Sequence, residues 1–299
     1  IPLTQTGEVR KVYKKLYKHQ PNYNRRITKL LPKDREEYLI KHQLFGGGDT
    51  HGNSINVNVV IRDEDIGSKD EASAYPAVMF AERYPMSRFI EVQEGPADFN
   101  FERFCYAFYI RLYDVKKKGS LTYLARSRCV SVSGGIYDNG RIAAAKEIFL
   151  YCTENEYIMI QRLYDCKIEI LKVRKAIKGY LDKKYVNYII ELYRDKTQLK
   201  GVAGYEDLYM QQKQYLNSLY GCMVTDIVQP QIIYDNKTGW RANTDFNSLI
   251  DKALQEAHEK FYKNYLSYDW GYYVTSHARY RLWDMILKLP EDDVIYFDT

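Results

Sequence analysis

The sequence predicts an α+β fold, in which an antiparallel sheet is flanked by helices. Residues 101–175 contain short runs rich in Tyr, Phe, Ile and Val, a composition typical of strands. Further along the chain, apolar residues recur three and four positions apart, which is the period of amphipathic helices. With 299 residues, the chain can bury one large core or two modest ones.

The composition is that of an ordinary soluble globular protein, with 45% apolar and 28% charged residues. A net charge of +5 permits a polyanionic partner but does not establish one. The 30 tyrosines suit stacking against nucleic-acid bases, and an AT-rich coding genome explains them equally well. The sequence has no apolar run of about 18 residues, so we expect no membrane-spanning helix.

The cysteines indicate a reducing compartment. There are five, an odd number, and no two of them have the spacing of zinc ligands. We therefore expect free and mostly buried thiols in a cytoplasmic protein.

The first 55 residues read as a connector. Residues 1–44 are rich in Lys, Arg and Tyr and predict an arm with one or two helices on a basic surface. Phe45 and three glycines follow. A run of glycines allows a ligand to approach the backbone and meet its N–H groups, so Gly47 and Gly48 are candidate phosphate contacts. A plain turn is the alternative.

The next segment carries the first candidate carboxylate. Residues 56–63 alternate in the manner of a strand, and a turn over residues 65–70 would then deliver Asp70. Pro76 is expected to keep Tyr75 out of helical geometry. Alternatively, Asp70 is only the N-cap of a helix over residues 72–82.

The middle of the chain predicts the sheet. Residues 101–115 and 120–132 read as the two strands of a hairpin. The Arg-Ser-Arg run at 126–128 is a candidate phosphate contact, and an exposed strand end is the alternative. Further elements are expected as follows: turns at 133–135 and 139–140, a strand at 146–152, a helix at 153–164 capped by Thr153, and a strand at 166–175.

The remainder predicts helices and a last strand. Residues 182–197 and 206–220 are helical and are separated by a turn containing Gly201 and Gly204. Two more helices are expected at 246–266 and 273–289, and a short strand at 294–298. His277, within the last helix, is expected to be structural.

One helix face has unusual chemistry. Lys213, Asn217, Tyr220 and Gly221 are spaced at offsets of 0, 4, 7 and 8, which places them on one face. A face that only packed into a core would carry Leu, Ile or Ala. This one suits a ligand with phosphates at one end and a flat base at the other.

The residues on this face lie in a segment, Lys-x-x-x-Asn-Ser-Leu-Tyr-Gly, that resembles the fingers-helix motif of family B DNA polymerases. Residues 70–76 (Asp-Glu-Ala-Ser-Ala-Tyr-Pro) are similar to the Asp-x-x-Ser-Leu-Tyr-Pro motif of that family, with Ala74 in place of Leu. Residues 294–299 resemble the beginning of its Tyr-x-Asp-Thr-Asp-Ser motif. The motifs occur in the family's order, and the resemblance covers residues 43–299.

The resemblance implies a polymerase palm plus a two-helix fingers subdomain. It divides the chain into a connector and glycine-rich template loop (1–55), a first palm part (56–175), fingers helices (176–224) and a second palm part (225–299). The implied partners are primer–template DNA and a dNTP, without a membrane. The motif spacing is similar to that of the protein-primed phage and plasmid branch, so a terminal protein is a candidate primer. The acidic motifs of a 3′–5′ exonuclease are absent.

The resemblance also implies template-directed nucleotidyl transfer with two Mg²⁺ ions, for which Mn²⁺ can substitute. The residues that match the family's functional positions fall into three groups. Metal ligands are Asp70, Glu71 through its carbonyl, and Asp298, of which Asp70 and Asp298 are catalytic. Nucleotide contacts are Ser73, Tyr75, Lys213, Asn217 and Tyr220. Lys196 is a further candidate at a place where the family has a basic residue, without an exact motif, and surface solvation is its alternative. DNA contacts are Phe45, Gly47, Gly48, Ser218 and Gly221.

The sequence departs from the pattern at its end. The second Asp of the last motif would follow Thr299, so we expect this chain to bind nucleic acid weakly and to polymerise little or nothing. Two alternatives stay open. One is a non-catalytic nucleic-acid-binding module with a polymerase-like fold, and the other is a structural protein with a basic surface.

Overall fold

A computed structural model describes residues 4–62, 66–229, 231–237 and 239–299. The chain forms two compact units, which we describe separately. The helical unit comprises Ile1–His42 and Asp182–Gly271, and the sheet unit comprises Gln43–Leu181 and Tyr272–Thr299. The four predicted subdomains stay a prediction, since the two units are a coarser division.

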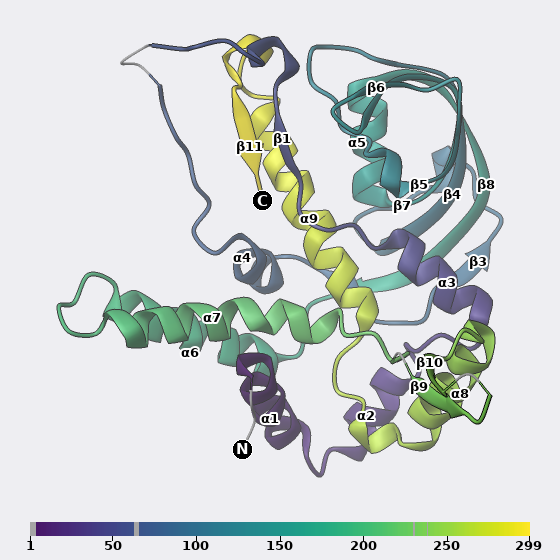
Figure 1. Ribbon diagram of the computed structural model, residues 1–299, viewed down its shortest axis with the longest axis vertical. Helices are drawn as coiled ribbons and strands as arrows, with labels where there is room; N and C mark the ends of the chain where they lie inside the picture. The colour runs from purple at the N-terminus through teal and green to yellow at the C-terminus, as the bar shows by residue number, and fades with distance from the viewer. Residues whose placement is uncertain (1–3, 63–65, 230, 238) are drawn as a thin grey trace. The chain divides into compact units, whose positions relative to one another are not determined.

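The sheet unit is built on three long antiparallel strands, which Figure 1 shows curling around α5. They are β4 (Phe104–Lys117), β7 (Arg141–Thr153) and β8 (Tyr164–Gly179), with β4 in the middle. Shorter strands complete the sheet: β2 (Tyr84–Pro85), β3 (Ile90–Val92), β5 (Cys129–Ser133) and β6 (Ile136–Asp138). The predicted α+β class with an antiparallel, palm-like sheet is confirmed.

The core of this unit lies on the face of the sheet that receives α5 (Glu154–Leu163). Alternate residues of β4, such as Phe108 and Ile110, are fully buried there. Trp283 reaches the same core from α9 (Tyr268–Ile286). Burial of such large side chains is the main stabilising contribution to the unit.

Local sequence explains several boundaries in the sheet unit. Asn139 and Gly140 have positive φ angles of 44° and 79° and join β6 to β7, as a two-residue hairpin turn requires. Thr153 precedes α5, and its N–H donates to Glu156 Oε2 at 2.9 Å, which confirms the predicted cap. The predicted strands at 146–152 and 166–175 are confirmed within β7 and β8.

The predicted hairpin over residues 101–115 and 120–132 is wrong. Strand β4 pairs with β7 and β8, whereas β5 pairs with β7. The segment between them contains the short 3-10 helix η3 (Arg126–Arg128). Strand-like composition shows that a segment joins a sheet, but it does not identify the partner.

The predicted strand over residues 56–63 is also wrong, as far as the structure describes it, to residue 62. The 3-10 helix η1 (Ser54–Asn56) is followed by irregular, exposed chain. The nearby strand is β1 (Thr50–Gly52), which pairs antiparallel with β11 (Tyr296–Asp298). The exposed valines at 57, 59 and 60 show that alternation without a core to cover does not make a strand.

Two further expectations, about Asp70 and Tyr75, are wrong at helix α4 (Ala74–Ala81). Its N-cap is Ser73, with φ 58°, so Asp70 is not the cap. Tyr75 and Pro76 are its second and third residues. Pro76 is accommodated because N–H groups in the first turn of a helix need no intrahelical partner.

The helical unit contains the predicted antiparallel pair, which Figure 1 shows side by side. It consists of α6 (Lys183–Leu199) and α7 (Glu206–Met223), joined by a turn in which Gly201 and Gly204 have φ of 76° and 83°. Leu216 and Leu219 are buried in α7. The predicted pair of antiparallel helices joined by a turn is confirmed.

Tyrosines form much of the core of the helical unit. The rings of Tyr13 and Tyr185 stack with centroids 4.9 Å apart, and those of Tyr17 and Tyr23 at 4.0 Å. Tyr17 also donates a hydrogen bond of 2.9 Å to Asp182, the N-cap of α6. These tyrosines are therefore packing residues and are not available for stacking on bases.

The helical unit contains more elements than the sequence predicted, and two helices have different bounds. Three helices precede the sheet unit, where one or two were expected. The elements are α1 (Gln5–Tyr17), α2 (Pro21–Thr28), α3 (Arg35–Leu44), which ends in the sheet unit, strands β9 (Ile232–Asp235) and β10 (Gly239–Ala242), and α8 (Phe246–Glu259). Helix α8 ends seven residues before the predicted position, and α9 begins five residues before it.

Three further 3-10 helices complete the described chain: η2 (Pro96–Asp98), η4 (Phe261–Lys263) and η5 (Glu291–Asp293). All five cysteines are free, and four of them are buried, as predicted. Among the described residues, the helices are too short or too polar to cross a membrane.

Candidate functional site

The glycine-rich loop at residues 45–48 has its carbonyl groups held by two arginines. Arg128 donates to the carbonyls of Gln43 (3.1 Å), Leu44 (3.2 Å) and Phe45. Arg279, from α9, donates through Nη1 to those of Gly46 (2.7 Å) and Gly47 (2.6 Å). Carbonyls of five consecutive residues are thus fixed by two side chains, and this loop is not a plain solvated turn.

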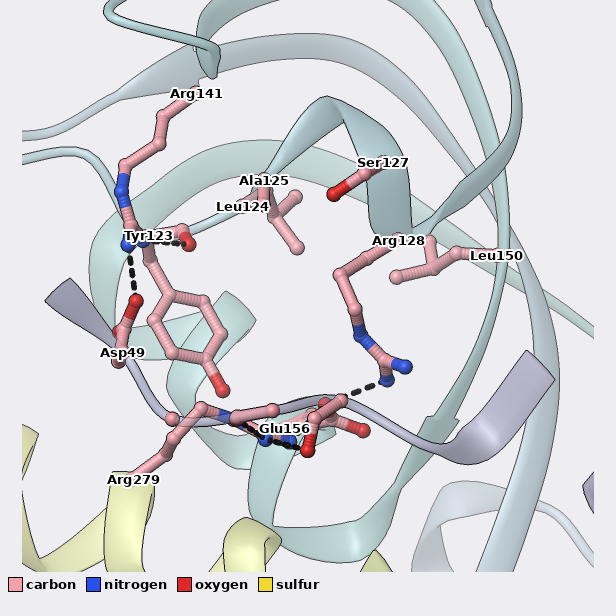
Figure 2. A pocket seen from close by; sticks show the side chains of 13 residues that line it. Asp49, Tyr123, Leu124, Ala125, Ser127, Arg128, Arg141, Leu150, Glu156 and Arg279 are labelled. Carbon is pink, nitrogen blue, oxygen red and sulfur yellow. Dashed lines mark hydrogen bonds and ion pairs between the residues drawn. The ribbon is translucent and has the colours of Figure 1, made fainter. Parts of the chain in front are cut away.

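Both arginines converge on one carboxylate. Figure 2 shows Arg128 and Arg279 reaching Glu156, which accepts from Arg128 Nη2 at 2.8 Å and from Arg279 Nη2 at 2.6 Å. Burial by itself raises the pKa of Glu156, but the charges of the two guanidinium groups outweigh it, so the pKa lies below its ordinary value. Glu156 is therefore ionised at neutral pH.

A cavity of about 150 Å³ adjoins the loop and these side chains. Its wall includes five charged side chains, with Arg128, Arg141 and Arg279 facing Asp49 and Glu156 (Figure 2). Three guanidinium groups and two carboxylates leave one net positive charge. The site therefore favours an anion at the loop.

The three glycines of the loop have different surroundings. A Cβ added at Gly46 would lie 2.8 Å from Arg279 Nη1 and 2.9 Å from Arg128 Nε. At Gly48 it would lie 2.4 Å from Thr299 Oγ1 and 3.0 Å from the Tyr75 hydroxyl. At Gly47 it would meet none of the described atoms within 4 Å. Gly47 is therefore the position where a ligand can approach the backbone closely.

The loop continues into β1, which pairs with β11, the strand that holds Asp298. Asp49 is buried and accepts hydrogen bonds from Arg141 and from the indole N–H of Trp283. Its own N–H donates to Thr299 Oγ1 at 2.7 Å. In β1, the Thr50 hydroxyl donates to Asp298 at 2.6 Å. The glycine loop and the predicted carboxylate of the last motif therefore occupy one continuous structure.

The two carboxylates predicted to bind metal, Asp70 and Asp298, are both exposed in the sheet unit. Asp70 is exposed on irregular chain, and Glu71 forms a 3.0 Å ion pair with Arg281. Asp298 is exposed at the end of β11. Among the described residues, no group of three or more His, Cys, Asp or Glu side chains is placed to hold a metal. Mg²⁺ prefers oxygen ligands such as carboxylates and carbonyls. These residues would fill only a few of its coordination positions, so other oxygens would fill the rest.

The predicted nucleotide contacts in the sheet unit lie at the start of α4. Ser73 is its N-cap, and Tyr75 is in its first turn, with the hydroxyl near Gly48. The structure thus brings Tyr75, Gly48 and Thr299 together. Tyr75 is half-buried, and its ring is fixed by helical backbone geometry instead of by an extended segment.

The predicted contacts in the helical unit lie on α6 and α7. Lys213 and Asn217 are exposed, and Ser218, Tyr220 and Gly221 are partly buried beside them. The opposite face of α7 is the buried one, so the one-face pattern predicted from the sequence is present. Lys196, on α6, lies over the Tyr193 ring with its Nζ 4.9 Å from the centroid.

Four residues of the site were not predicted from the sequence as functional. They are Asp49, Arg141, Glu156 and Arg279, and each of the four is buried in an ion pair. The only local signal was the Thr-x-x-Glu pattern at 153–156, which marks a capping box and does not reveal the arginines. His277, expected to be structural, is buried against Asn155 and the Arg83 carbonyl, and burial lowers its pKa.

Comparisons with known proteins give the fold. No family model and no curated protein matches the sequence. Among solved structures, phi29 DNA polymerase bound to primer–template DNA is similar over 100% of this chain, with 17% identity and a TM-score of 0.68. Its ternary complex with incoming nucleotides is similar over 99% of this chain, with 16% identity and a TM-score of 0.66. Its complex with single-stranded DNA is similar over 100% of this chain, with 16% identity and a TM-score of 0.64.

The chain spans 47–48% of the length of these polymerase chains. At this identity the similarity establishes the fold and leaves residue roles to be argued separately. The chain has a DNA-polymerase-like fold similar to that of the phage phi29 enzyme.

Proposed function

We propose that this chain is the palm and fingers part of a template-directed DNA polymerase of family B. The observation that carries the proposal is the similarity of the whole chain to phi29 DNA polymerase, together with the glycine loop joined to the Asp298 strand. The reaction is attack of a primer 3′-OH on the α-phosphate of a dNTP. A new bond forms between the primer oxygen and the α-phosphorus, the hydroxyl proton is lost to water, the bond from the α-phosphorus to the bridging oxygen breaks, and pyrophosphate leaves.

In the proposed reaction, Asp70 and Asp298 are the metal-binding carboxylates, with the Glu71 carbonyl as a further oxygen ligand. Two Mg²⁺ ions, replaceable by Mn²⁺, would supply activation of the attacking oxygen and neutralisation of the leaving one. The absence of a preformed three-ligand group among the described side chains means that phosphate oxygens and water would complete the coordination.

The other proposed contacts use the chemistry of each position. Lys213, exposed on α7, neutralises triphosphate charge, and Asn217 hydrogen-bonds the same group. Tyr220 and Gly221 pack on the nascent base pair. Ser73, Tyr75 and Lys196 are the remaining proposed nucleotide contacts, with the Tyr75 ring under the deoxyribose.

The proposed DNA contacts are Phe45, Gly47 and Gly48 in the sheet unit and Ser218 and Gly221 in the helical unit. The DNA is a primer–template, and a terminal protein is a candidate primer on the motif spacing alone. Binding at the loop is supported by the net positive charge of its surroundings and by the open approach to Gly47.

The loop assignment is tested with Gly47→Ala, measured by fluorescence anisotropy of labelled primer–template. Since a methyl group at Gly47 meets none of the described atoms, the protein stays folded, while a phosphate is kept from the backbone. We expect DNA affinity to fall about tenfold, the equivalent of one lost hydrogen bond to a charged group. Gly95→Ala is the matched control, because its added Cβ makes only an ordinary contact at 3.7 Å. Equal affinities for the two variants would contradict this role.

A non-catalytic DNA-binding module is the second candidate, favoured by the exposure of both proposed carboxylates. It predicts DNA binding that does not respond to Asp70→Ala in the presence of Mn²⁺. The polymerase proposal predicts Mn²⁺ binding that Asp70→Ala weakens.

A further inference from the structure

We infer that Glu156 is a positioning residue, which holds the glycine loop through Arg128 and Arg279 and so sets where a DNA phosphate meets Gly47. This inference rests on the proposed function for its ligand, and on the contacts of the sheet unit for its mechanism. It also gives a role to Arg128, the last residue of the Arg-Ser-Arg run at 126–128, which the proposed reaction does not use.

Both oxygens of Glu156 are committed. Oε2 accepts from the Thr153 N–H at 2.9 Å, which fixes the carboxylate at the first turn of α5. Oε1 accepts from Arg128 at 2.8 Å and Arg279 at 2.6 Å. The carboxylate thus ties two arginines from distant parts of the chain to one helix N-terminus.

The negative charge is what allows the two arginines to share this space. The Arg128 and Arg279 side chains are largely buried, with 18% and 8% exposure, and both donate to the same oxygen. Two adjacent guanidinium groups repel each other unless an anion compensates them, and a buried charge without a partner is strongly unfavourable. Removing the charge of Glu156 should therefore move at least one arginine away.

The loop depends on both arginines. Arg128 holds the carbonyls of residues 43–45, and Arg279 those of Gly46 and Gly47. Displacing Arg279 releases two consecutive peptide groups where the backbone is open to a ligand. Displacing Arg128 releases Phe45, at the start of the loop, and the last two carbonyls of α3. Glu156 itself is 7% exposed and does not need to touch DNA.

The same contacts extend to the proposed metal ligand. Past Gly47, the loop packs Gly48 against Thr299 and the Tyr75 hydroxyl. The following N–H donates to Thr299, and Thr50 donates to Asp298. A displaced loop would therefore shift Asp298 along with the phosphate contact.

The sign of one measurement separates positioning from general electrostatics. Glu156→Gln removes a negative charge beside a DNA-binding loop, which by charge alone would strengthen DNA binding. Positioning predicts the opposite, an affinity about tenfold lower and a shallower salt dependence, by about one phosphate contact. The matched control is Glu147→Gln, which removes a carboxylate that pairs with Arg111 elsewhere in the sheet. We expect Glu147→Gln to bind DNA as tightly as the wild type or more tightly.

Hydrogen exchange of the amides at residues 46–49 tests the mechanism without DNA. We expect faster exchange in Glu156→Gln than in the wild type and Glu147→Gln. Arg128→Lys is a second variant, which keeps the charge and loses the fork of donors, and it should also exchange faster and bind DNA less tightly. If Glu156→Gln fails to fold, Arg128→Lys decides both measurements.

The two proposals fail in different ways. Failure of the wild type to bind primer–template would overturn the proposed function, while the exchange comparison still decides whether Glu156 holds the loop. Unchanged exchange, or DNA binding by Glu156→Gln as tight as that of Glu147→Gln, would overturn the positioning role.

Discussion

The clearest stability prediction concerns Gly46, where the added methyl group of Gly46→Ala has no room. Its Cβ would lie 2.8 Å from Arg279 Nη1 and 2.9 Å from Arg128 Nε. Neither arginine can easily retreat, because each is hydrogen-bonded to Glu156 and to loop carbonyls. Overpacking of this kind costs about 1–3 kcal/mol.

Part of that cost is offset, since alanine restricts the unfolded chain and so stabilises the folded state by about 0.4–1 kcal/mol. The free energy of unfolding should therefore fall by roughly 1–2 kcal/mol in Gly46→Ala. For a unit of this size, that corresponds to a Tm lower by about 2–8 °C.

The assay is thermal unfolding followed by the fluorescence of buried Trp283, with Trp240 and Trp270 replaced by Phe in every variant. Gly47→Ala is the internal control, because its methyl group points into open space. Its Tm should stay within about 1 °C of the parent or rise slightly. Equal Tm values for Gly46→Ala and the parent would refute the account of the arginine contacts.

Three further predictions address charge and hydrogen bonding. Lys213→Ala should weaken dNTP binding, measured by isothermal titration calorimetry, about tenfold or more. Lys184 is an exposed lysine on α6, and Lys184→Ala should leave dNTP binding unchanged. Equal losses of affinity in the two variants would count against a specific triphosphate contact. Because the pKa of Glu156 is lowered in the folded state, its ionised form stabilises the fold above the unfolded pKa of about 4.3. This stability is lost as the pH falls through the folded pKa, so the urea midpoint of Glu156→Gln should fall less steeply with acid than that of the wild type. Parallel curves of urea midpoint against pH would contradict this. Tyr38→Phe removes a hydrogen bond of 2.8–2.9 Å to Asp226 and should reduce the free energy of unfolding by about 1.5–3 kcal/mol in urea titrations, while no change would show that water replaces the phenol.

The sequence predicted elements whose signals are local. The Asn139-Gly140 turn, the capped start of α5 and the α6–α7 pair each follow from residues close together in the chain. The exposed face of α7 was also predictable, since a helical period fixes which side chains share a face.

The sequence did not predict contacts that depend on distant segments. Nothing local distinguishes β5 from β7 and β8 as a partner of β4, so the hairpin prediction failed. Glu156, Arg128 and Arg279 come from three separate segments, and their pairing exists only in the folded unit. Tyr75 was predicted to be non-helical because helical geometry is disfavoured for a residue before proline. It is helical in the structure because proline is tolerated in the first turn of a helix.

The central claim is that Asp70 and Asp298 bind the metal ions of a polymerase palm. The most direct test is a Mn²⁺ titration followed by electron paramagnetic resonance, with the chain saturated with primer–template and a dNTP. The account predicts bound Mn²⁺ in the wild type, a loss of affinity in Asp70→Ala or Asp298→Ala, and no change in Asp292→Ala, a nearby exposed carboxylate. Identical Mn²⁺ binding in the wild type and the Asp70→Ala/Asp298→Ala double variant would contradict it.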